Sequence, residues 1–259
     1  YVHVGMVTSG TLTVGKGVEA RVDRARRTNI RAHHSVTHLL HEALRQTLGD
    51  HIAQKGSLQS SDRTRFDVSH PVAMTPAQIQ TVEQIVNEEI WADTKVVTRL
   101  MDLDTARTSG ARALFGEKYE AEVRVVAMGR QNENSKNAFS VELCGGTHVK
   151  RTGEIGLFKI VGESAVGSGV RRVEAVAGST ALAYLEAQEG RLMETAQILK
   201  ASTHDVVDRV KTLIEEKKKL EQELTNLRRK LATGGAGEAG PVAKDIGGVN
   251  FISRVLEDV

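Results

Sequence analysis

The sequence predicts an α+β fold in which helices pack on a mainly antiparallel sheet, and three observations support this class. Apolar residues recur with helical spacing in two long segments, 28–48 and 76–91. Short β-branched runs bounded by glycines lie between and after them. From 179 to 232 the chain becomes rich in Ala, Leu, Glu, Lys and Arg, which is typical of long helices.

The composition is that of an ordinary globular chain. Of its 259 residues, 40% are hydrophobic and 26% charged, which suffices for one or two packed domains. Cys144 is the one cysteine, so no intramolecular disulfide forms and a cytoplasmic location is expected. Since neither a run of about 20 apolar residues nor a secretory signal is present, no membrane association is expected. A net charge of +2 attracts nucleic acid only weakly.

The first segment, 1–26, reads as the end of a β barrel. Residues 4–8 and 11–22 are β-branched runs separated by Ser-Gly and interrupted by Gly-x-Gly, which predicts two strands. Because the chain opens directly in a strand-like run and without methionine, we expect a fragment of a longer protein.

The second segment, 27–178, is predicted to be the main α+β domain. Its first helix, 28–48, buries Leu40 and Leu44 and ends at Gly49, and its second starts at Thr75-Pro76. The remaining expected elements are strands at 95–101, 122–128, 139–143, 156–161 and 170–177, a short helix at 102–109 and a turn at 115–118. The glycine-rich stretch 162–169 lacks a nucleotide-binding fingerprint, so it is read as a flexible connection.

The last part of the chain differs in kind. Within 179–232, leucines and valines from Val206 to Leu231 follow heptad spacing with one interruption at Lys217. This pattern fits a helical hairpin packed on itself as well as a dimer zipper. Residues 233–241 read as a flexible linker, and 242–259 as the truncated opening strand of a further domain.

Two short residue pairs predict a metal site. If 29–48 is helical, His34 and His38 share one face, about 6 Å apart along the axis. Cys144 and His148 flank Gly145-Gly146, a turn that can bring the imidazole back toward the sulfur. Three nitrogens and one thiolate are ligands that suit zinc.

Neighbouring residues offer alternatives. His41 lies on the same stripe, and a His38/His41 pair is a less favoured ligand set, while His33 points about 100° away from His34. Asp67 is a candidate for accepting a hydrogen bond from a metal-binding histidine and so fixing its tautomer. The other interpretation of Asp67 is a salt bridge to Arg63 or Arg65.

Six strings, in order and spacing, resemble the editing domain of the alanyl-tRNA synthetase family. They are HSVTHLLH from His34, QKGS from Gln54, RFDVSH from Arg65, ALFGEKY from Ala113, CGGTH from Cys144 and GVRRVEA from Gly169. The resemblance covers nearly the whole chain and implies a C-terminal fragment of a class II alanine-tRNA ligase that carries the editing domain. The family's aminoacylation domain, which uses ATP and Mg²⁺, would precede Tyr1.

The resemblance implies an aminoacyl-tRNA deacylase that releases serine or glycine from the 3′ end of mischarged tRNA(Ala). It assigns one Zn²⁺ ion to His34, His38, Cys144 and His148, and a contact with substrate or water to Gln54. Thr37, Thr147 and Arg172 are further candidates for lining the pocket. The implied partners are the tRNA(Ala) acceptor end and a second subunit, bound through the C-terminal region of the full-length protein.

The sequence leaves two questions open. Zinc either takes part in the hydrolysis or mainly positions the pocket, because a complete set of four protein ligands is typical of structural sites. The chain is either an editing hydrolase or a non-catalytic tRNA-binding and dimerisation module with a structural zinc. A free-standing trans-editing protein is the remaining alternative.

Overall fold

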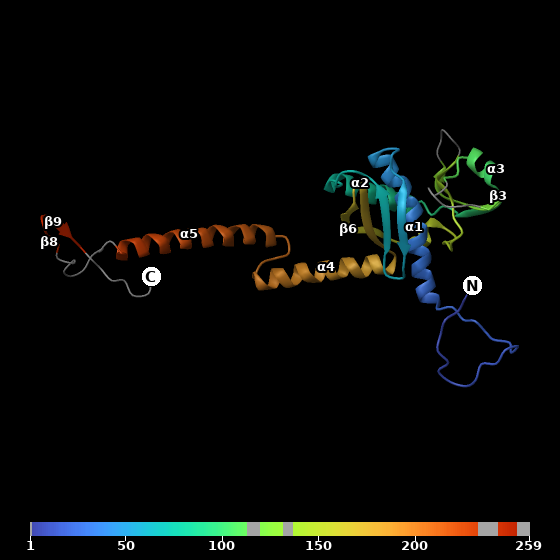
Figure 1. Ribbon diagram of the computed structural model, residues 1–259, viewed down its shortest axis with the longest axis horizontal. Coiled ribbons are helices and arrows are strands. Elements are labelled where there is room, and N and C mark those ends of the chain that lie inside the picture. The colour runs from blue at the N-terminus through green and yellow to red at the C-terminus, as the bar shows by residue number, and fades with distance from the viewer. Residues whose placement is uncertain (1, 113–119, 132–136, 233–242, 253–259) are drawn as a thin grey trace. The chain divides into compact units, whose positions relative to one another are not determined.

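The computed structural model describes residues 2–112, 120–131, 137–232 and 243–252 (Figure 1). The chain divides into two compact units, Tyr1–Glu186 and Ala187–Val259. The expected turn at 115–118, the expected linker at 233–241 and the whole ALFGEKY string lie outside the described residues.

The first unit contains two antiparallel sheets. The larger has the strand order β1-β2-β7-β6, formed by Gln54–Gln59, Thr64–Ser69, Val170–Ala177 and Phe158–Gly167. The smaller has the order β3-β4-β5, formed by Val97–Asp102, Glu122–Gln131 and Ala138–Leu143. The predicted α+β class is confirmed, with two sheets in place of one.

Two long helices supply much of the core. α1 (Arg24–Leu48) begins at Asp23, whose side chain accepts a hydrogen bond from the backbone of Arg26. α2 (Pro76–Trp91) starts with a reciprocal capping box between Thr75 and Gln78. Their apolar stripes join side chains of the larger sheet in one buried cluster that includes Leu39, Leu40, Leu44, Val82, Val86, Ile90, Phe66, Phe158 and Val173. Burial of these apolar stripes therefore fixes which face of each helix points into the core.

Short elements complete the unit, and one expectation about them is wrong. α3 (Leu103–Thr108) follows β3, and a 3₁₀ turn, η1 (Thr152–Ile155), precedes β6. The stretch 162–169 is not a flexible connection: β6 runs to Gly167, and only Ser168 and Gly169 form the turn into β7. Register shifts at Ile160/Gly162 and Ala165/Gly167 absorb the extra residues, which is how glycines fit within a paired strand.

The strands expected at 4–8 and 11–22 are absent from residues 2–23, which form neither strand nor helix and are exposed. Within residues 2–22 the backbone N–H of Lys16 donates a hydrogen bond to the carbonyl of Thr13 at 3.3 Å. A β-branched run needs a neighbouring strand to satisfy its backbone groups, and no described strand pairs with this one.

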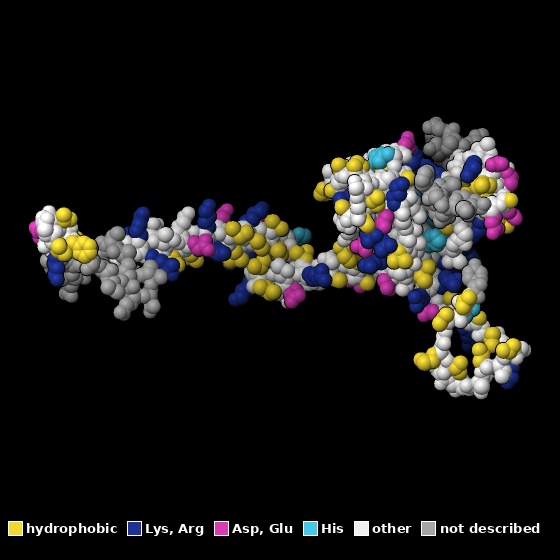
Figure 2. All heavy atoms as spheres, viewed as in Figure 1, with side chains coloured by type: hydrophobic (Ala, Val, Ile, Leu, Met, Phe, Trp, Pro, Cys, Tyr) yellow, Lys and Arg dark blue, Asp and Glu magenta, His cyan; other side chains and the backbone are white. Residues whose placement is uncertain are grey.

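The second unit consists of helix and a small hairpin. α4 (Ser179–Ile198) crosses the boundary between the units, and α5 (Val206–Ala232) is followed by β8 (Lys244–Ile246) and β9 (Val249–Phe251). No coiled coil forms among the described residues, and Leu213, Leu220, Leu224 and Leu227 of α5 remain 37% to 64% exposed. Hydrophobic side chains are visible on the surface of this part of the chain (Figure 2). Within the described chain, every helix is too short or too polar to cross a membrane.

Candidate metal centre

Helix α1 presents His34 and His38 on one face. Their rings stack with centroids 5.6 Å apart and planes 20° from parallel, one turn apart on the helix. The opposite, apolar face of α1 is buried, and Val36 and Leu40 are fully enclosed. Burial of that face fixes the rotation of the helix, and with it the direction of the two imidazoles.

Cys144 and His148 come from the turn that follows β5. The backbone N–H of Cys144 donates to Arg124 O at 2.9 Å, which extends the β4/β5 ladder to the start of the turn. The Arg124 guanidinium also donates to the carbonyl of Gly146, so β4 holds the turn in place. The backbone N–H of Gly146 in turn donates to the Cys144 sulfur at 3.4 Å.

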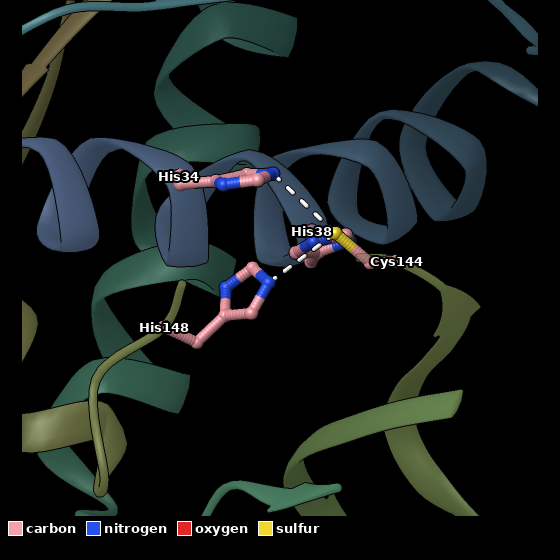
Figure 3. A group of neighbouring side chains, drawn as sticks. All are labelled: His34, His38, Cys144 and His148. Carbon is pink, nitrogen blue, oxygen red and sulfur yellow. Dashed lines mark hydrogen bonds between the residues drawn. The ribbon is translucent and has the colours of Figure 1, made fainter. Parts of the chain in front are cut away.

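These elements bring the four predicted ligands together (Figure 3). One ligand atom from each of His34, His38, Cys144 and His148 lies within 4.8 Å of all the others. The Cys144 Sγ atom is 3.4 Å from His34 Nε2 and 3.3 Å from His148 Nε2. Ligand atoms around a tetrahedral zinc ion lie roughly 3.3–3.8 Å apart, as bond lengths of about 2.0–2.3 Å require.

A buried nitrogen without a partner supports a metal at this point. Among the described residues, His38 Nε2 is buried and has no hydrogen-bond partner. A buried polar atom normally has a partner, and an unpaired one costs about 1–3 kcal/mol. A metal ion bound by the four side chains would satisfy it, so the donor set fits zinc.

The electrostatics of Cys144 and His148 favour the protonation states that zinc needs. For His38, by contrast, burial would lower the pKa, but Glu142 and Cys144 raise it to about 10. Burial would raise the pKa of the Cys144 thiol, but hydrogen bonds from His148 and His34 outweigh burial and lower it to about 3. Burial lowers the pKa of His148, which keeps its imidazole neutral. A thiolate and neutral imidazoles are the forms that bind metal.

Glu142 is a residue of this site that the sequence analysis missed. Its carboxylate oxygens accept hydrogen bonds from His38 Nδ1 at 2.5 Å and from His41 Nδ1 at 2.7 Å. Burial would raise the pKa of Glu142, but the two histidines hold it well below its usual range. One signal could have found it, since Glu142 lies two residues before Cys144 and strand residues spaced by two share a face.

His33, His41 and Asp67 do not belong to the four-ligand cluster. His33 Nδ1 lies 3.0 Å from Ser60 O, on the side of the larger sheet, and His41 binds Glu142. Asp67 does not reach a histidine, and its salt bridge is to neither Arg63 nor Arg65. Its two oxygens accept from Arg172 at 2.7 and 2.8 Å, because β2 and β7 are neighbours in register.

The four residues predicted to line the pocket are Gln54, Thr37, Thr147 and Arg172. Gln54 is half-buried at the start of β1 and donates to Ser57 Oγ at 3.2 Å. Thr37 donates to the carbonyl of His33 at 2.8 Å, and Thr147 is exposed in the turn. Arg172 pairs with Asp67 as described. Within the described part of the chain, the side-chain hydrogen bonds of Gln54, Thr37 and Arg172 go to residues other than the four predicted ligands.

The four ligands differ in their exposure. His38 is only 7% exposed, whereas His34, Cys144 and His148 are half-buried. Three of the four ligands are therefore partly exposed to solvent.

Comparisons with known proteins agree with this arrangement. Residues 123–174, which contain Cys144 and His148, match the family described as Threonyl and Alanyl tRNA synthetase second additional domain. Along its whole length the chain is 53% identical to an alanine–tRNA ligase from a Chelativorans species and 54% to one from Sinorhizobium medicae. It is 55% identical to the enzyme of that name from Granulibacter bethesdensis. The chain spans about 30% of the length of these curated relatives.

Proposed function

The chain belongs to the alanine–tRNA ligase family, and we propose that it performs hydrolytic editing, releasing serine or glycine from the 3′ end of mischarged tRNA(Ala). The observation that carries this proposal is the cluster of His34, His38, Cys144 and His148. Two of its members, Cys144 and His148, lie in the segment that matches the additional domain, and the other two lie on α1. The proposed partner is the acceptor end of the tRNA, and the proposed location is the cytoplasm.

The chemistry of amino-acid selection explains why such a site is needed. An aminoacylation site shaped for alanine cannot fully exclude glycine, which is smaller, or serine, which adds one hydroxyl. A single methylene or hydroxyl changes binding by only about 1–3 kcal/mol. A second site that hydrolyses the wrong ester supplies the missing discrimination.

The four ligands and Gln54 have separate roles in the proposal. When bound, a zinc ion supplies a Lewis acid that can polarise an ester carbonyl or acidify water. His38, the most buried of the four, would hold the ion together with His34, Cys144 and His148. The Gln54 side chain offers both a donor and an acceptor, which suits either the serine hydroxyl or an attacking water.

A non-catalytic role is the second candidate, and one observation favours it. The cluster offers three nitrogens and one sulfur, a complete tetrahedral set, whereas catalytic zinc usually keeps one position for water. In that case the chain would bind tRNA and contribute to dimerisation, with the exposed leucines of α5 as the apolar surface. A free-standing trans-editing protein would share the editing chemistry.

A deacylation assay with metal quantification separates these candidates. We expect the chain to release serine and glycine from tRNA(Ala) and to spare alanine. Cys144→Ala should lose both bound zinc and serine release, while the matched control His204→Ala, an exposed histidine of the second unit, should keep both. No release by the parent chain would favour the non-catalytic module. Full release by a zinc-free Cys144→Ala chain would refute a metal-dependent site.

A further inference from the structure

Glu142 is a buried carboxylate that lies between β5 and α1. Its side chain is 4% exposed, and both oxygens are occupied, one by His38 and one by His41. The two histidines are three residues apart on α1, so their Nδ1 atoms converge on one carboxylate from the same helix face.

The geometry assigns the two nitrogens of His38 different tasks. Nδ1 lies 2.5 Å from Glu142 Oε2, so the proton that this hydrogen bond needs is on Nδ1. Nε2 is buried without a hydrogen-bond partner among the described residues, and His38 belongs to the four-ligand cluster, so Nε2 is the nitrogen left for a metal. A proton on Nδ1 leaves a lone pair on Nε2, which is what a metal ion binds.

His41 is not a candidate ligand, and it fixes the carboxylate instead. Its Nδ1 donates to Glu142 Oε1 at 2.7 Å, and its ring packs against Phe66 with centroids 5.3 Å apart. The ring of His41 is only 7% exposed, so it has little freedom to leave the carboxylate. With one oxygen held by His41, the other oxygen has a fixed direction toward His38.

We propose that Glu142 is a positioning residue, which sets the tautomer and ring orientation of His38 for metal binding, and that His41 acts through Glu142 by holding its carboxylate. This inference rests on the proposed metal site and adds to it a residue pair that binds neither metal nor substrate. Carboxylates behind metal-binding histidines commonly raise metal affinity by about 10–100-fold.

Zinc affinity of the whole chain tests this proposal without any activity measurement. Glu142→Gln keeps the size of the side chain but replaces the acceptor pair by one acceptor and one donor. We expect it to weaken zinc binding at least about tenfold in a chelator competition and to shift the absorption bands of the cobalt-substituted chain. Glu42→Gln is the matched control, since Glu42 is a buried acid of α1 that pairs with Arg45 and Arg112. It should change zinc affinity less than about twofold.

A double-mutant cycle tests the role of His41. His41→Asn should weaken zinc binding by several-fold in the parent chain and add almost nothing in the Glu142→Gln background, because its effect passes through the carboxylate. Independent, additive losses would overturn that part of the proposal. His41→Asn also serves as the measured variant should Glu142→Gln fail to fold, as circular dichroism would show.

The outcomes separate this inference from the proposed function. Unchanged zinc affinity in Glu142→Gln, with the parent binding zinc tightly, would overturn the positioning role and leave editing intact. A parent chain that binds zinc but releases no serine would overturn editing and leave the positioning role intact. A folded parent chain that binds no zinc would overturn both.

Discussion

Gly146 lies directly against the imidazole of His34: a Cβ atom built at this glycine would be 1.9 Å from His34 Cε1 and 2.5 Å from Nδ1. No real Cβ contact is that short, so the glycine is required by the close approach of the turn to the ring. Gly146 therefore leaves the space that the imidazole of His34 occupies. At Gly145, by contrast, an added Cβ would have no atom within 4 Å.

Gly146→Ala is expected to disrupt the metal centre without unfolding the chain. The added methyl must push His34 away from the Cys144 sulfur or lift the turn, and either shift spoils the ligand geometry. Zinc affinity should fall at least about tenfold, measured by chelator competition. Gly145→Ala is the matched control and should bind zinc as the parent does; equal affinity in both variants would contradict the close approach.

Ser35→Ala should weaken both the site and the fold. Ser35 Oγ lies 3.2 Å from His148 Nδ1 and accepts from the backbone N–H of Val149 at 3.0 Å. Its removal leaves a buried N–H without a partner, which costs about 1–3 kcal/mol in unfolding free energy, and frees the ring of His148. Urea unfolding of the zinc-free chain measures the first effect and zinc titration the second. The exposed Ser164→Ala is the control, and a Ser35→Ala chain as stable as that control would contradict the prediction.

Much of the core was predictable because helical stripes are local. The Leu and Ile spacing of α1 and α2, the Thr75-Pro76 start and Gly49 at the end of α1 are all visible within a few residues. The strands β1 and β2 were missed for the opposite reason. β2 alternates Phe66 and Val68 with Arg65 and Asp67, and the acid is neutralised by Arg172, about a hundred residues away in sequence.

The metal centre shows the same division between local and distant information. His34 with His38 and Cys144 with His148 are each four residues apart, so spacing alone suggested a shared site. Glu142 was not suggested, because its role depends on a contact with α1 across 101 to 104 residues of sequence. The strands expected in 4–22 failed because a strand pattern does not reveal whether a partner strand lies beside it.

Asn87 is expected to be a major stabilising residue outside the site. Its amide donates to Phe158 O at 3.0 Å, and its carbonyl accepts from Phe158 N at 2.9 Å, so α2 takes the place of a neighbouring strand beside β6. Asn87→Ala leaves two buried backbone groups unpaired and should lower the unfolding free energy by roughly 2–4 kcal/mol. Calorimetry should show a matching fall in Tm, while the exposed Gln80→Ala on the same helix should change Tm little. A loss below about 0.5 kcal/mol would contradict this role.

The Asp67–Arg172 pair should make part of the stability depend on acid pH. Hydrogen bonds from Arg172 outweigh the opposing effect of burial and hold the pKa of Asp67 below its usual range. A carboxyl with a lowered folded pKa stabilises the chain above its unfolded pKa, about 3.9, and loses that contribution as pH falls through the folded value. Asp67→Asn should therefore cost about 1 kcal/mol at pH 7, and the gap to the parent should close as pH falls below about 4. Urea unfolding between about pH 3 and about pH 7 measures the difference in unfolding free energy between the variant and the parent, with the exposed Asp62→Asn as control. A difference that does not change with pH would show that packing, and not charge, is responsible.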